Sequence, residues 1–203
     1  MAYLPGRRAG GKLVAMTDGH EHDGGENHGR DDHVHDASCA VAHGTARGPA
    51  GDKVLAAVFA SPVASFLLRY GADAGYRAVL VEPDAERAKA VTVDGFELTD
   101  SLDGIDPENT DVVVTDHHRS ELGVLLRDAL AAPARWVGIM GNPRHEGPHV
   151  TALTELGVPA TEISKVHRPI GVNIGSRTPA EIAIATMAGL IAERNGKPGG
   201  FTF

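Results

Sequence analysis

Val54-Leu-Ala-Ala-Val-Phe59 is the clearest indication of the fold class. It is a continuous apolar run bounded by Lys53 and by Ser61-Pro62, which is typical of a strand buried on both faces of a parallel sheet. Pro62 fits the first position of a following helix, with Ser61 as its N-cap. Ala78-Val-Leu-Val81 is a second buried run, so the sequence predicts a β-α-β unit.

The same alternation continues along the chain. Further strands are predicted at 111–115, 135–140 and 162–166, and helices at 84–90, 121–131, 147–157 and 179–194. Strands that alternate with helices imply a parallel sheet covered on both faces. We therefore predict an α/β fold, a Rossmann-like three-layer sandwich with a mostly parallel sheet, over residues 52–197, followed by a tail at 198–203.

The last helix has the most complete boundary pattern. Thr178 is placed to be the N-cap, Pro179 the first helical residue and Glu181 the partner in a capping box. Gly196 and Pro198 predict where the helix ends. The expected apolar face comprises Ile182, Ile184, Ala185, Ala188, Leu190 and Ile191.

Composition excludes several classes of protein. With 203 residues and 42% hydrophobic content, the chain suits one soluble domain plus a tail. A formal net charge of −8 and a pI near 5.7 argue against nucleic-acid binding. Cys39 is the single cysteine, so no intrachain disulfide can form, and no apolar run approaches the roughly 20 residues of a membrane span. We expect a cytoplasmic protein with no membrane contact.

Residues 1–51 differ in composition from the rest. Between Thr17 and Gly51 the chain is rich in His, Asp and Gly and has little to bury, which predicts a flexible segment. Its imidazoles, carboxylates and thiol suit a divalent metal such as zinc, nickel or copper. The alternative is a solvated tail with incidental metal affinity. The candidate metal ligands are His20, His22, His28, His33, His35 and Cys39.

The first strand-to-helix turn departs from the usual dinucleotide pattern. Glu82 follows the second strand, where an acid would accept a ribose hydroxyl group, although it could equally be an acid that merely ends a strand. The turn itself, Phe59-Ala60-Ser61-Pro62, contains no glycine, and its proline has no N–H to donate. This argues against a conventional nicotinamide-dependent dehydrogenase.

Two later turns carry polar residues at the expected carboxyl edge of the sheet. Thr115-Asp116-His117-His118 follows the middle strand and could bind metal or move protons; alternatively, it is a loop that caps the next helix. Gly138 to Arg144 follows the next strand, where glycines would admit a ligand and Arg144 could grip a phosphate or carboxylate; alternatively, it is an ordinary tight turn. The glycines and the asparagine of 168–175 favour ligand binding here.

From Val54 onward the chain resembles the C-terminal Rossmann domain of the XdhC/CoxI family. The segment Pro169-Ile-Gly-Val-Asn-Ile-Gly175, joined to Thr178-Pro-Ala-Glu-Ile-Ala183, is similar to the family's terminal signature. Thr115-Asp116-His117 resembles its threonine, histidine and aspartate, with the last two exchanged, and the family's glycine-rich first turn is absent. By the same resemblance, we expect residues 1–51 to correspond to a remnant of the family's N-terminal domain, which holds a cysteine.

The resemblance implies a maturation factor for a molybdenum hydroxylase. Such a protein would bind molybdenum cofactor, support its sulfuration with a sulfurtransferase, and deliver it to a xanthine dehydrogenase or CO dehydrogenase type apo-enzyme, usually as a homodimer. We expect an accessory protein rather than an enzyme. The candidate cofactor-binding residues are Ser61, Glu82, Thr115, Asp116, His117, Gly138, Gly141, Asn142, Arg144, Gly171, Asn173 and Gly175.

Two other functions compete with this hypothesis. The first is a nucleotide-dependent oxidoreductase or nucleotidyltransferase on the same scaffold, binding NAD(P) or another nucleotide, which Glu82 favours and the first turn opposes. The second is a metal-handling protein in which the His-rich segment does the work.

Overall fold

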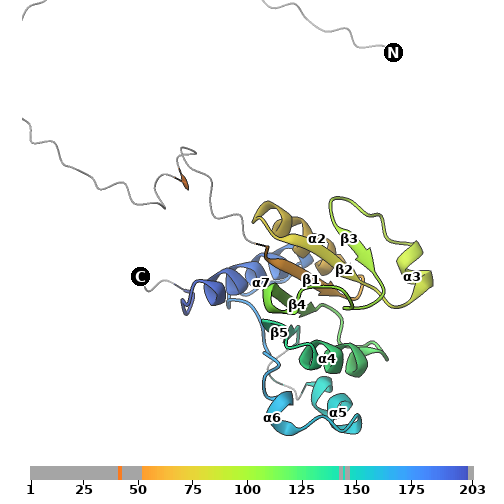
Figure 1. Ribbon diagram of the computed structural model, residues 1–203. Helices are drawn as coiled ribbons and strands as arrows, with labels where there is room; N and C mark the ends of the chain where they lie inside the picture. The colour runs from red at the N-terminus through yellow and green to blue at the C-terminus, as the bar shows by residue number, and fades with distance from the viewer. Residues whose placement is uncertain (1–40, 43–51, 142–143, 145–146, 201–203) are drawn as a thin grey trace, which may run out of the picture. The chain divides into compact units, whose positions relative to one another are not determined.

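The computed structural model describes residues 41–42, 52–141, 144 and 147–200. The chain divides into two units, Met1–Ala46 and Arg47–Phe203. Within the first unit only Val41 and Ala42 are described, and both are helical and exposed. All elements discussed below lie in the second unit (Figure 1).

The second unit alternates strands and helices from its start. In chain order the elements are β1 (Val54–Val58), α2 (Pro62–Asp73), β2 (Arg77–Val81), α3 (Ala85–Lys89), β3 (Glu97–Thr99), η1 (Pro107–Asn109), β4 (Thr110–Val114), α4 (Leu122–Ala131), β5 (Trp136–Ile139), α5 (Pro148–Glu155), α6 (Ala160–Ile163) and α7 (Pro179–Arg194).

The strands form one parallel sheet in the order β3-β2-β1-β4-β5. Successive side chains of β1 point to opposite faces. Leu55 and Ala57 pack with residues of α2 and α7, whereas Ala56 and Val58 pack with residues of α4, α5 and α6. Helices thus cover both faces of the sheet (Figure 1), which confirms the Rossmann-like three-layer prediction.

Helix α7 begins as the sequence predicts. Thr178 Oγ1 accepts a hydrogen bond from the Glu181 amide, and the Glu181 carboxylate accepts one from the Thr178 amide, so the capping box is complete. Gly196 follows with a φ of +61°, in the left-handed region. The buried face differs from the prediction, because Ile184 and Ile191 are exposed while Ala183, Thr186 and Met187 are buried.

Two further features differ from the sequence predictions. The segment predicted as a strand at 162–166 begins instead as helix α6, after which His167 forms a single parallel bridge with Gly138. The short edge strand β3 was not predicted, since three residues that are exposed or half-buried carry little periodicity.

Across the described residues, no helix has both the length and the apolar content that crossing a membrane requires.

Candidate functional site

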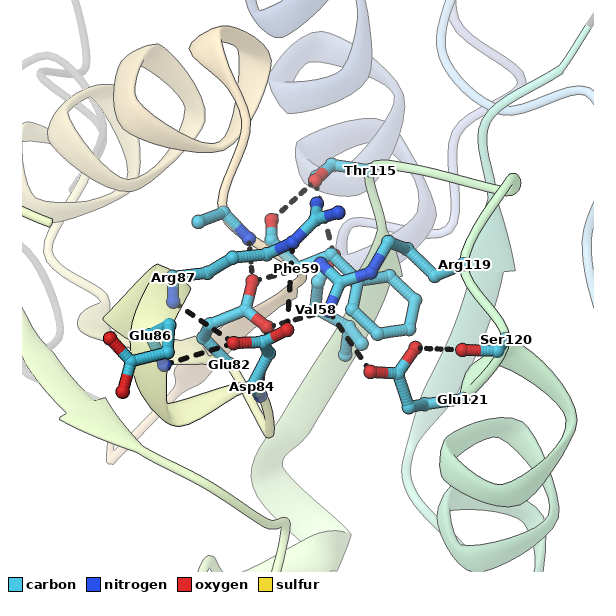
Figure 2. A network of polar contacts seen from close by, with 11 residues as sticks. Val58, Phe59, Glu82, Asp84, Glu86, Arg87, Thr115, Arg119, Ser120 and Glu121 are labelled. Carbon is cyan, nitrogen blue, oxygen red and sulfur yellow. Dashed lines mark hydrogen bonds and ion pairs between the residues drawn. The ribbon is translucent and has the colours of Figure 1, made fainter. Parts of the chain in front are cut away.

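The candidate site lies along the carboxyl edge of the sheet. In an open parallel sheet the crevice for ligands opens between two neighbouring strands whose connections run in opposite directions, which here are β1 and β4. The segments after β1, β2 and β4 meet at this crevice, and those after β5 lie beside it. Figure 2 shows the contacts around Glu82 in detail.

The first turn has an unusual backbone. Phe59 is fully buried and has a φ of +74°, a left-handed conformation that favours glycine. The turn brings the Ala60 amide to the end of β2, where it donates to Glu82 Oε2 at 2.8 Å. The phenylalanine therefore adopts the conformation that the missing glycine would supply, and the amide of the turn is directed at a carboxylate of the chain itself.

Glu82 is enclosed by donors. Arg119 donates from Nη1 to Oε2 at 3.0 Å and from Nη2 to Oε1 at 2.8 Å, and the Asp84 amide donates to Oε1 at 3.1 Å (Figure 2). The Glu82 side chain is 0% exposed and that of Arg119 only 5%. Burial alone would raise the pKa of Glu82, but the hydrogen bonds from Arg119, Ala60 and Asp84 outweigh it and hold the pKa below its usual value.

This geometry bears on the prediction that Glu82 binds a ligand, which stays a prediction. Each of its oxygens already accepts two hydrogen bonds from the chain.

The hydroxyl of Ser61, another predicted cofactor-binding residue, is also hydrogen-bonded within the chain. Ser61 caps α2 by accepting from the Ala64 amide, and its hydroxyl donates to Thr115 Oγ1 at 3.0 Å. Thr115 in turn donates to the Phe59 carbonyl at 2.8 Å. Side chains of the protein thus bridge the crevice between β1 and β4.

The loop after β4 presents imidazoles next to this bridge. His117 is half-buried and His118 exposed, and their ring centroids lie 4.1 Å apart. Asp116 accepts from the His118 amide, which closes a local turn rather than capping α4. Burial lowers the pKa of His117, the charges of His118 and Arg168 lower it further, and Asp116 partly opposes them. His117 is therefore held in its neutral form, which can donate and accept hydrogen bonds.

An open cavity of about 580 Å³ lies beyond β5. It lies between the end of β5, the 169–176 segment and α7, and its volume suits a small cofactor. Apolar side chains and backbone make most of its wall, with Arg144, Asn173 and Ser176 as polar members. Of the predicted site residues, Gly141, Arg144, Gly171, Asn173 and Gly175 line this cavity.

The glycines of this region have a structural explanation. A Cβ on Gly138 would lie 2.2 Å from the Trp136 ring, and one on Gly141 would lie 2.5 Å from the Arg168 guanidinium. A Cβ on Gly171 would lie 2.9 Å from the backbone of α7. These glycines let parts of the chain approach one another. Gly175 differs, since its φ is +69° and nothing lies within 4 Å of its would-be Cβ.

Some predicted residues lie outside the described part of the chain. They are Asn142 and the candidate metal ligands His20, His22, His28, His33, His35 and Cys39. Within the described ranges, no group of three or more His, Cys, Asp or Glu residues is placed to hold a metal ion.

Two arginines at the site were missed by sequence reasoning. Arg119 follows His118 directly, and its guanidinium lies 4.6 Å from the centroid of the Phe59 ring as it pairs with Glu82. Arg168 precedes the cavity-lining segment and lies against Gly141. An arginine next to a polar motif at a predicted strand end was the available indication for both, but Glu82, the partner of Arg119, is distant in sequence.

Comparison with known proteins agrees with this architecture. The sequence model of the XdhC Rossmann domain matches residues 55–190. The chain belongs to the XdhC family. The Escherichia coli (strain K12) protein named "Uncharacterized protein YqeB" is 34% identical over 96 residues, which is 47% of this chain and 17% of that protein. The chain thus spans only a small part of this relative.

A crystal structure also shares the XdhC-type fold. A Bacillus halodurans protein described as a xanthine dehydrogenase superposes with a TM-score of 0.58 at 21% sequence identity. The match covers 71% of this chain and 45% of that one. At this level of identity the likeness shows a common fold.

Proposed function

We propose that this XdhC-family chain is a maturation factor that binds molybdenum cofactor in the cavity beside β5 and delivers it to a molybdenum hydroxylase. The observation that carries the proposal is the position of that cavity. It opens at the carboxyl edge of the sheet, where ligands of α/β proteins bind, and it is formed by the 169–176 segment against α7. Side chains of the protein bridge the crevice between β1 and β4, and the cavity beside β5, at about 580 Å³, is larger than the cavity of about 420 Å³ that Ala60, Ser61 and residues of α2 line.

The residues of the cavity fit a flat, anionic cofactor. Ile170, Ile174 and Ile182 supply apolar wall suited to the faces of a ring system, and Ile174 is 54% exposed at the cavity. Arg144, which is exposed, supplies a positive charge able to hold a phosphate through two hydrogen bonds. Asn173 and Ser176 add donors and acceptors for polar ring atoms.

The role of the chain's residues would be to bind and orient the cofactor. When bound, the cofactor supplies the metal and sulfur chemistry that the client enzyme later uses. Arg144 would fix its anionic end, and the 169–176 backbone would set its orientation. A sulfurtransferase, an apo-enzyme of the xanthine dehydrogenase or CO dehydrogenase type, and a second copy of the chain are the proposed partners.

Equilibrium titration with isolated molybdenum cofactor under anaerobic conditions tests the proposal. The wild-type protein should show saturable binding, and the Arg144→Ala variant should bind at least tenfold more weakly because it loses the charge at the cavity. Arg127→Ala is the matched control, since Arg127 is an exposed arginine of α4 that pairs with its neighbour Asp128. No saturable binding to the wild type, or equal affinities for the two variants, would contradict the proposal.

The competing enzyme hypothesis is not favoured by the site. The carboxylate that would bind a nucleotide ribose is already occupied within the chain. The metal-handling hypothesis concerns residues outside the described part of the chain and stays a prediction. Deletion of residues 18–43 separates it from the maturation role, because cofactor binding beside β5 should survive the deletion.

A further inference from the structure

The groups that usually bind a nucleotide in this fold form a hydrogen bond with each other in this protein. In dinucleotide-binding domains the first turn supplies backbone amides to a pyrophosphate, and the acid after the second strand binds ribose hydroxyls. Here the Ala60 amide of the first turn donates to Glu82, the acid after β2, at 2.8 Å. The donor and the acceptor that a nucleotide would need are thus joined in one hydrogen bond.

Arg119 contacts the Glu82 carboxylate in the way that the hydroxyl groups of a bound ribose would. Its Nη1 and Nη2 atoms donate to the two oxygens of Glu82 at 3.0 and 2.8 Å, a two-point contact comparable to that of two neighbouring ribose hydroxyls (Figure 2). The guanidinium also lies over the Phe59 ring at 4.6 Å. Glu121 accepts a further hydrogen bond from Nη2 at 3.2 Å and so holds the arginine from its other side.

The backbone of the first turn supports the same arrangement. Phe59 holds a φ of +74° although it is not glycine, and its fully buried ring forms the surface on which Arg119 rests. Pro62 has no amide proton to offer at the start of α2, and the Ser61 hydroxyl is directed at Thr115. The Ala60 amide, the Glu82 carboxylate and the hydroxyls of Ser61 and Thr115 are therefore engaged by other residues of the chain.

We propose that Arg119 is an internal occupant of the ribose position at Glu82, and that it makes this Rossmann domain exclude nucleotides. The proposal concerns ligand specificity and is independent of whether the cavity beside β5 binds molybdenum cofactor. The ligand class that is excluded is a nucleotide with a free ribose 2′,3′-diol and a pyrophosphate, and ADP-ribose is its simplest probe.

Calorimetric titration with ADP-ribose tests the exclusion on three proteins. The wild type should show no saturable binding at millimolar probe, whereas Arg119→Ser should acquire binding at least tenfold tighter than the wild-type limit. The matched control Arg127→Ser, which removes an exposed arginine of α4, should remain silent. The acquired binding should be lost with an ADP-ribose analogue whose adenosine ribose lacks the 2′- and 3′-hydroxyls, because Glu82 would accept its hydrogen bonds from that diol.

Two further measurements keep the test decisive if Arg119→Ser fails to fold. Arg119→Lys retains the charge but not the two-point contact, so it should bind ADP-ribose measurably. In the wild type, the amide resonance of Ala60 and the Nε–H resonance of Arg119 should not shift on addition of ADP-ribose. Saturable shifts of these wild-type resonances, or a folded Arg119 variant that stays silent, would overturn the proposal.

Discussion

Arg194 in the last turn of α7 pairs with Asp111 at the start of β4, with its Nε 2.7 Å from Oδ2. Arg135 pairs with the other oxygen of this fully buried carboxylate, Nε to Oδ1 at 2.6 Å. The Arg194 guanidinium also donates to the Asn109 carbonyl at 2.7 Å. The two arginines join the last helix and the segment before β5 to the amino end of the central sheet, opposite the candidate site.

Removal of one of these arginines should destabilise the domain. We expect Arg194→Ala to lower the free energy of unfolding by about 2 kcal/mol, because a buried carboxylate loses one of its charged hydrogen-bond donors. Urea denaturation followed by circular dichroism measures the change. Arg127→Ala, in which a 45% exposed side chain is lost, should stay within about 0.5 kcal/mol of wild type. Equal losses in both variants would contradict the role assigned to Asp111.

The ion pair of Glu82 predicts how stability depends on acid pH. Its pKa in the folded state is lowered, so its stabilising contribution is complete above the unfolded-state pKa of about 4.3 and disappears as the pH falls toward the folded-state value. Glu82→Gln should therefore be less stable than wild type at neutral pH and should lose less stability on acidification. Denaturant unfolding at a series of pH values tests this; parallel curves for the two proteins would argue against it.

His117 should titrate below its ordinary value of 6.5. Burial is the main cause, and the charges of His118 and Arg168 add to it. Because the folded state resists protonation, stability should fall as the pH decreases below about 6.5, and His117→Gln should reduce that slope. NMR titration of the ring protons measures the pKa directly, and Arg168→Gln should raise it. An unchanged pKa in that variant would show that the charge of Arg168 does not reach His117.

Two glycines of the cavity segment offer a matched pair. A Cβ on Gly171 would meet the backbone of α7 at 2.9 Å, whereas one on Gly175 would meet nothing, although both residues have positive φ. Gly175→Ala should cost only backbone strain, about 1 kcal/mol. Gly171→Ala should cost more and should also weaken cofactor binding, because the 169–176 segment must move off α7. Thermal unfolding and cofactor titration distinguish the two variants, and equal effects would mean that the close approach is unimportant.

The capping box of α7 should contribute measurably to stability. Thr178→Ala removes the acceptor of the Glu181 amide, and we expect a loss of about 1 kcal/mol. Thr154→Ala is a suitable control, because that hydroxyl only donates to the carbonyl one turn earlier in α5. Chemical denaturation of the two variants should show a larger loss for Thr178→Ala, and the reverse order would contradict the cap.

Elements that depend on local patterns could be predicted from the sequence. Apolar runs fixed β1, β2, β4 and β5, because a strand covered on both faces needs apolar side chains in succession. Thr178, Pro179 and Glu181 fixed the start of α7, because capping joins residues only three positions apart. Alternation of these elements was enough to predict the three-layer architecture.

Contacts between residues that are distant in the sequence could not be predicted. Arg119 and Glu82 lie 37 positions apart, and Arg194 and Asp111 lie 83 apart, so neither pair leaves a local pattern. Gly171 allows its segment to approach the backbone of α7, and this contact could not be predicted because the helix follows later in the sequence. Residues 162 and 163 lie in helix α6 although a strand was predicted at 162–166, since short apolar runs do not distinguish the two. The sequence pattern predicted that ligands bind at the carboxyl edge of the sheet. Long-range packing bridges the crevice between β1 and β4 at that edge and forms the open cavity beside β5.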